Sequence, residues 1–296
     1  MTGRSRSEAV LVRRVRALSR HLPAAVAGDA VGVHQARVAS RRLREAVPVL
    51  GLALPERRRT RLDRRLRRIT RALGPIRELD VSADRLGDLY TGTPTPGVAA
   101  VLEALEARRA ARLRTLPARL ERARPERVLE RLSRLAFLVG DVPAAVWRGV
   151  LSARTAARGR RLRDALEHAG VLYAGEPLHA ARIAIKKLRY AAELAGELRV
   201  APTKTAVREL KAAQETLGRL HDLDVLGAAV QEVAGAGRAH ETELARVLDR
   251  VERECRQLHA AYLDQRPRLI ALADAATDRL APRIRRRTAP RPPPAT

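Results

Sequence analysis

The chain has 296 residues, of which 46% are hydrophobic and 31% charged, and its formal net charge is +26. This hydrophobic content excludes a disordered chain and is enough for one large or two medium folded domains. A surface with so much positive charge repels itself unless an anion neutralises it, so the composition indicates a polyanionic partner.

The composition also indicates the fold class and the compartment. Leu, Ala and Arg dominate and only 2% of residues are aromatic, which favours an all-α protein. The single cysteine, Cys255, has no partner for an internal disulfide. The N-terminus has no secretory pattern, and no stretch approaches the about 18 apolar residues of a membrane span. We therefore expect a cytoplasmic protein that does not span a membrane.

The periodic segments predict two repeats of roughly six helices each, at 1–140 and 144–281, followed by a disordered basic, proline-rich tail at 282–296. In the first repeat we expect helices to begin near Glu8, Gly32, Glu56, Ile76, Gly97 and Pro125. In the second we expect them to begin near Ala144, Pro177, Pro202, His221, Gly237 and Arg266. Gly74 and Gly218 are expected to terminate helices.

One predicted helix, "VHQARVASRRLREAV", separates its basic and apolar residues. At 100° per residue its basic residues fall on one narrow stripe, and its alanines and leucines cluster on the opposite side. The stripe consists of His34, Arg37, Arg41 and Arg44. The helix can therefore bury its apolar face while a ladder of cations points away from it.

The same pattern returns in the second half as "LHAARIAIKKLRYAAEL". Its stripe consists of His179, Arg182, Lys186 and Arg189. A second pair of segments, "LGPIRELDV" and "LGRLHDLDV", recurs at nearly the same offset, and a basic pair upstream of each places Arg67 opposite Lys211. Two pairs of segments at one offset predict an internal duplication.

Such ladders suit a linear anion with repeated charges. Arginine binds phosphate oxygens through two donors, and a histidine at the end of the ladder can donate one N–H. Inorganic polyphosphate, nucleic acid and an anionic membrane all fit the charge. The few aromatic residues make base stacking an unfavourable mode, which leaves non-specific backbone contacts to a duplex, and membrane binding ranks third.

Enzymatic interpretations find less support. The chain lacks a phosphate-binding loop, a dinucleotide turn and a nucleophile elbow. The segment "HDLD" could suggest a metal site, but its counterpart is "RELD", and arginine is no metal ligand. We expect neither metal nor cofactor, and we hypothesise that Asp80 and Asp224 position stripe arginines. A metal-dependent phosphohydrolase that uses these aspartates remains the enzymatic alternative.

Other basic and aromatic residues have less specific expectations. The basic residues of the first helix in each half are expected to lie mostly on solvated faces; they are Arg13, Arg16, Arg154, Arg158 and Arg161. Tyr190, whose counterpart is Glu45, is expected to pack in the core rather than to serve as a donor.

The paired helices and paired LG turns resemble the motifs of the CHAD family, the conserved histidine α-helical domain, over nearly the whole chain. The resemblance implies two helical bundles about a pseudo-two-fold axis, enclosing a basic cavity that binds inorganic polyphosphate. It assigns the ligand contacts to His34, Arg37, Arg41, Arg42, Arg44, Arg67, His179, Arg182, Lys186, Lys187, Arg189 and Lys211. Arg42 and Lys187 lie away from the centre of their stripes.

The sequence departs from the family pattern at Glu78, which replaces the first aspartate after the first LG, and at Ser40. Neither change removes a cation. We therefore expect non-catalytic binding of polyphosphate in the cytoplasm, with polyphosphate granules as a candidate location. A backbone-reading binder of duplex nucleic acid is the alternative.

Overall fold

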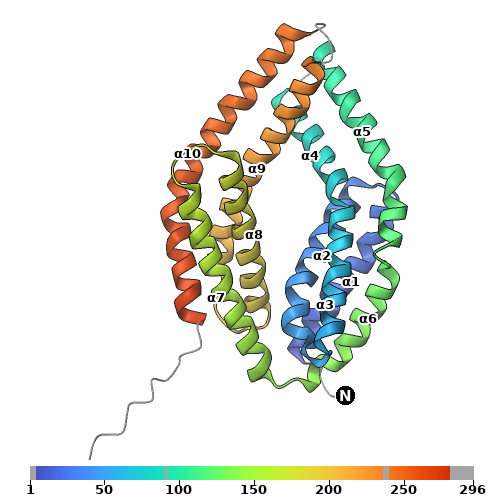
Figure 1. Cartoon of the computed structure of the whole chain (residues 1–296), viewed down its shortest axis with the longest axis vertical. Helices are drawn as coiled ribbons and strands as arrows, with labels where there is room; N and C mark the ends of the chain where they lie inside the picture. Colours follow the sequence, from blue (N-terminus) through green and yellow to red (C-terminus); the bar gives the residue numbers. More distant parts are fainter. Residues whose placement is uncertain (1–4, 91–92, 236–239, 281–296) are drawn as a thin grey trace, which may run out of the picture.

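The computed structural model describes residues 5–90, 93–235 and 240–280, and every regular element in these ranges is helical (Figure 1). The expected all-α fold is therefore confirmed. The tail at 282–296 and the expected helix start at Gly237 lie outside the described residues. Within those residues no single helix is long and apolar enough to cross a membrane, although Pro125–Asp141 and Ala144–Ala169, bent by 115°, meet the length and composition criteria as a pair.

The first half of the chain forms six α-helices, each starting within two residues of its predicted position. They are α1 (Arg6–Val26), α2 (Ala30–Leu50), α3 (Glu56–Ala72), α4 (Gly74–Leu89), α5 (Pro96–Glu121) and α6 (Pro125–Leu138), with short 3₁₀ turns at Gly51–Ala53 and Val139–Asp141. The Asp29 carboxylate caps α2 by accepting from the Gly32 amide at 2.5 Å. Pro96 and Pro125 stand at the starts of their helices, where the missing amide hydrogen costs no intrahelical bond.

The second half forms four helices: α7 (Ala144–Ala169), α8 (Gly175–Glu197), α9 (Lys204–Gly235) and α10 (Glu241–Leu280). The predicted breaks near His221 and Arg266 are wrong, because α9 and α10 continue through them. Gly218 does not terminate a helix, since no proline follows it and buried leucines repeat on both sides of it. Gly74 is followed by Pro75, which cannot donate the next helical hydrogen bond, so α3 and α4 are separate.

The helices enclose three apolar cores. The first joins α1, α2, α3 and α6 with the end of α5 and the adjoining parts of α7 and α8, and the second joins α7, α8, α9 and α10. The third lies where α4 and α5 meet α9 and α10. Figure 1 shows α2 and α8 on the inner sides of the two helix groups, and these two helices contact each other. The helices that carry the two basic stripes are thereby brought together.

The contact between α7 and α10 depends on Gly159. A Cβ at this position would lie 2.6 Å from the Ala273 carbonyl oxygen and 2.8 Å from Thr277 Oγ1. We expect Gly159→Ala to lower the free energy of unfolding by about 1–3 kcal/mol, because the two backbones must separate. Gly149→Ala on the same helix, where a Cβ meets nothing within 4 Å, should raise it by about 0.5–1 kcal/mol. Urea denaturation compares the two, and equal effects would contradict the close packing.

Candidate anion-binding site

A cavity of about 610 Å³, here called the central cavity, lies between α2, α3, α7 and α8. Two carboxylates, Glu45 and Asp63, line it together with many more basic side chains. The basic lining consists of Arg37, Arg41, Arg44, Arg67, Arg71, Arg154, Arg158, Arg161, Lys186 and Lys187. Positive charge therefore greatly exceeds negative charge around this space.

Half of the residues predicted to contact an anion line the central cavity. They are Arg37, Arg41, Arg44 and Arg67 of the first half with Lys186 and Lys187 of the second. The structure thus brings together parts of both stripes. Arg182 lies nearby and pairs with Asp222 at 3.7 Å, whereas Lys211 is exposed on α9 and pairs with Glu215 at 3.5 Å.

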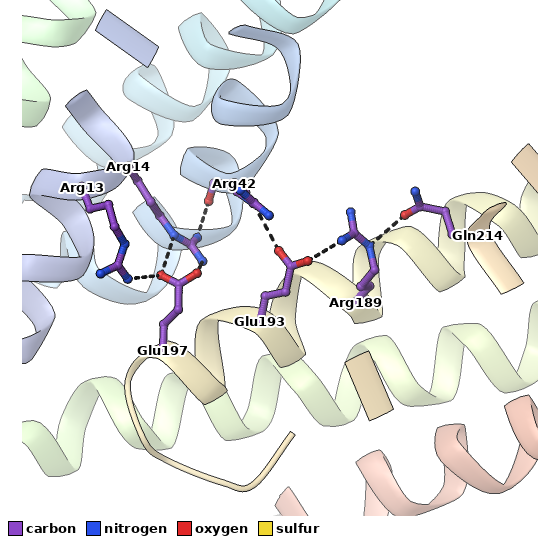
Figure 2. Close-up of polar contacts among 7 residues, drawn as sticks. All are labelled: Arg13, Arg14, Arg42, Arg189, Glu193, Glu197 and Gln214. Atoms are coloured by element: carbon purple, nitrogen blue, oxygen red, sulfur yellow. Dashed lines mark hydrogen bonds and ion pairs between the residues drawn. The ribbon is translucent and has the colours of Figure 1, made fainter. Parts of the chain in front are cut away.

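Arg42 and Arg189 are also absent from the cavity lining, and Figure 2 shows why. Both guanidinium groups bond to Glu193 of α8, Arg42 through Nε at 3.2 Å. Arg189 Nε also donates to Gln214 Oε1 of α9 at 2.9 Å. Their charges are therefore partly neutralised within the protein, and their side chains fasten α2 to α8 and α8 to α9.

A second group of contacts in Figure 2 joins α1, α2 and α8. Arg14, only 4% exposed, donates to the Arg42 carbonyl oxygen at 2.7 Å and to Glu197 Oε1 at 3.0 Å. Although burial alone would raise the pKa of Glu197, Arg14 and Arg13 hold it below its ordinary value. These charged pairs hold the two halves of the chain side by side next to the cavity.

Lys186 of the central cavity has no compensating carboxylate among the described residues. It has neither a hydrogen bond nor an ion pair with any residue that the structure describes. Burial, followed by the fields of Arg41, Arg182 and Arg37, lowers its pKa to about 6. Burial and Arg41 also lower the pKa of Arg37 to about 10, although Arg37 donates to the Thr70 carbonyl oxygen at 2.8 Å. The cavity therefore concentrates positive charge that the surrounding carboxylates do not balance.

The first arginine of each stripe has the same kind of neighbours. Arg37 lies 3.9 Å from Glu78, and Arg182 lies 3.7 Å from Asp222; both carboxylates are the first acidic residue after an LG. A Cβ at Gly74 would lie 2.7 Å from Arg37 Nη1, and one at Gly218 would lie 3.8 Å from Arg182 Nε. Gly74 thus leaves room for the Arg37 side chain, whereas a Cβ at Gly218 would make only an ordinary van der Waals contact with Arg182.

The hypothesis that Asp80 and Asp224 position stripe arginines is wrong. Asp80 accepts from Arg109 Nε of α5 at 2.6 Å, and Asp224 accepts from the Tyr173 hydroxyl at 2.7 Å. The carboxylates that lie beside the stripe arginines are instead Glu78, next to Arg37, and Asp222, next to Arg182. In the described residues no group of three or more His, Cys, Asp or Glu side chains has a metal-binding arrangement.

The histidines lie at the edge of the basic cluster. Partial burial and nearby arginines lower the pKa values of His34 and His179. The His179 ring stands 4.5 Å from that of His221, whose pKa is lowered to about 4 by burial and Arg182. At neutral pH these rings are uncharged, so they add hydrogen-bonding groups rather than positive charge.

Sequence reasoning missed several residues of the site. Arg71 was not identified, and Arg154 and Arg158 are half-buried in the cavity wall instead of lying on a solvated face; Arg13, Arg16 and Arg161 are exposed as expected. Glu45 is 5% exposed and accepts from Arg154 Nε at 2.5 Å and from Arg158 Nη2 at 3.1 Å. The spacing of Arg154, Arg158 and Arg161 on one helix face was the available signal.

Tyr190, which the sequence pattern pairs with Glu45, is 6% exposed. The Arg189 guanidinium lies 4.6 Å from the centre of its ring, within the range of a cation–π contact. The prediction that Tyr190 packs in the core is confirmed, and the residue is also part of the cavity lining.

Comparisons with known proteins show similarity over most of the chain. A family model described as CHAD domain matches residues 9–231. The crystal structure of the CHAD domain from the plant Ricinus communis has 22% sequence identity and a TM-score of 0.60, covering 92% of this chain and 91% of its own. PptA from Streptomyces chartreusis has 18% identity and a TM-score of 0.56, covering 93% and 97%. No curated protein matches the sequence.

Proposed function

The chain belongs to the CHAD domain family, and from this premise we propose that it binds inorganic polyphosphate in the central cavity without catalysing a reaction on it. The observation that carries the proposal is the lining of the cavity, in which ten basic side chains face two carboxylates. Polyphosphate carries negative charge along its whole length, and cations on successive helical turns can each engage a phosphate. Such a ligand would supply the charge that the protein lacks there.

The proposal includes an internal duplication, with α2 and α8 as equivalent helices of two bundles. Two features support it. Both helices contribute cations to the central cavity, and the pairs Arg37–Glu78 and Arg182–Asp222 occupy matching positions in the two halves. One polyphosphate chain would then contact both halves at once and gain affinity from their combined charge.

The shape of the site favours polyphosphate over nucleic acid. The cations lie in a cavity between four helices, which a slender flexible chain enters more readily than a stiff duplex. Tyr190 is the aromatic member of the lining, and its ring is already covered by Arg189. Stacked bases would therefore find little to contact.

A binding role is also supported by the engagement of the two aspartates that the hydrolytic alternative requires. Asp80 is held by Arg109 and Asp224 by Tyr173. We place the protein in the cytoplasm, at polyphosphate granules where these form, since its proposed ligand gathers there.

The test is a titration with long-chain polyphosphate at near-physiological salt, with duplex DNA at equal phosphate concentration as competitor. We expect polyphosphate to win by at least tenfold, and the affinity to fall with added salt because counterions are released on binding. Incubation with Mg²⁺ or Mn²⁺ should release no orthophosphate. Equal competition by DNA would mean that the net charge alone attracts anions, and would overturn the proposal.

A further inference from the structure

A second cavity, here called the outer cavity, lies where α3 meets the end of α5 and the start of α6. Its volume is about 920 Å³, and its only acidic lining residue is Glu121. Its basic lining residues, none of which has an ion pair with a described residue, are Arg65, Arg68, Arg71, Arg119, Arg122 and Arg124. Figure 1 shows the end of α5 and the start of α6 on the edge of the molecule opposite α10.

The arginines of the outer cavity are gathered despite their mutual repulsion. Arg68 Nη1 donates to the Arg122 carbonyl oxygen at 3.2 Å, which fixes one guanidinium at the rim. Arg65 Nη1 is buried and has no hydrogen-bond partner among the described residues. Burial, Arg131 and Arg124 lower the pKa of Arg65. A buried donor without a partner is costly, and an anion in the cavity would satisfy it.

Arg71 connects the two cavities, because it lines both of them. Among the α3 residues, Arg67 lines the central cavity, whereas Arg65 and Arg68 line the outer cavity. The two cavities therefore lie on opposite sides of α3, and Arg71 lies between them. Cations are therefore continuous from one cavity to the other.

The cavity on the α7 side of the central cavity does not continue the positive charge in this way. Arg161 lines the central cavity and also a cavity of about 510 Å³ on α7 and α10. There the three arginines are matched by three aspartates, and Arg163 already pairs with Asp274 at 2.6 Å. An anion leaving the central cavity in that direction would meet as much negative as positive charge.

We propose that a polyphosphate chain held in the central cavity continues over Arg71 into the outer cavity, so that the two cavities form one binding path. This inference rests on the proposed function, and it predicts that the affinity depends on the length of the polyphosphate chain. Chains confined to the central cavity use only its cations, whereas longer chains gain the arginines of the outer cavity as well.

The test compares tripolyphosphate with long-chain polyphosphate on matched variants. The outer variant Arg68→Gln/Arg119→Gln/Arg122→Gln removes three exposed cations from the outer cavity. The control variant Arg20→Gln/Arg246→Gln/Arg268→Gln removes three exposed arginines that line neither cavity, so both variants lose the same charge. Circular dichroism and thermal melting establish that each variant is folded.

We expect the outer variant to bind tripolyphosphate as the control does and to bind long chains at least tenfold more weakly. Its salt dependence with long chains should lose roughly 2 from the slope of log affinity against log salt, the share of three phosphate contacts. The continuous path is overturned if the outer variant and the control bind long chains equally. It is also overturned if tripolyphosphate binding falls as much as long-chain binding, because the outer cavity would then be the primary site. Failure of the wild-type protein to bind either ligand would instead refute the proposed function.

Discussion

Replacing Lys186 by methionine is expected to raise the free energy of unfolding by about 1–2 kcal/mol while weakening polyphosphate binding at least tenfold. Partial burial, followed by the fields of Arg41, Arg182 and Arg37, lowers the pKa of this lysine to about 6. Methionine keeps the apolar stem and removes an amine whose protonation the folded protein disfavours. Opposite signs for stability and affinity would distinguish a ligand-binding cation from a structural one.

The lowered pKa of Lys186 determines how the free energy of unfolding changes with pH. Between pH 6 and about 10 the unfolded chain holds a proton on Lys186 that the folded protein has released, so wild-type stability rises with pH across this interval. The methionine variant lacks this contribution. Its stability advantage should therefore be largest at and below pH 6 and should shrink as the pH rises. Urea denaturation at pH 6, 7.5 and 9 measures the difference, and a constant difference would contradict the assignment.

Polyphosphate binding should raise the lowered pKa of Lys186, because a phosphate beside the amine favours its charged form. Binding then takes up a proton near neutral pH, and the affinity falls as the pH rises from about 6. Calorimetry in buffers of different ionisation enthalpy counts the protons. Nearby histidines also contribute to the number of protons taken up on binding. The difference in proton uptake between the wild type and Lys186→Met therefore gives the contribution of the lysine. Equal uptake by both proteins would place the ligand away from this side chain.

Replacing Glu45 by alanine is expected to lower the free energy of unfolding by about 3–5 kcal/mol. Glu45 is buried against Arg154 and Arg158, whose side chains are 27% and 12% exposed, and its loss leaves two guanidinium groups without their carboxylate. Glu130→Ala removes an exposed partner of Arg134 and should cost less than about 1 kcal/mol. Urea denaturation at neutral pH compares the two variants.

Added polyphosphate should then stabilise Glu45→Ala more than the wild type, because the released arginines of the central cavity become available to the ligand. The expected readout is a larger rise in melting temperature for the variant than for the wild type at the same ligand concentration. A similar loss of stability in Glu45→Ala and Glu130→Ala would contradict the prediction that the buried ion pairs of Glu45 with Arg154 and Arg158 stabilise the fold.

The sequence predicts local features of this protein better than contacts between helices. Helix starts in the first half follow from capping residues and prolines, and the stripes follow from helical periodicity. The continuity of α9 through Gly218 was missed because helix propensity disfavours glycine, whereas packing on both sides keeps the helix intact.

The same distinction holds for the site. Arg37, Arg41 and Lys186 were identified from the stripe on their own helix. The pairing of Arg42 with Glu193, and the place of Arg71 in two cavity walls, depend on how separate helices approach one another. Periodicity within one helix carries no information about that approach.

The unbroken helices of the second half affect how the molecule can deform. α9 has 32 residues and α10 has 40, so they are about 48 and 60 Å long, and each crosses from the second apolar core into the third. Because each helix is continuous, it holds the second and third cores at a fixed distance from each other. In the first half the chain is interrupted between α3 and α4 at Gly74 and Pro75, where these two helices can hinge. We therefore expect the α3 wall to adjust its distance to a ligand while the α8 and α9 side stays fixed.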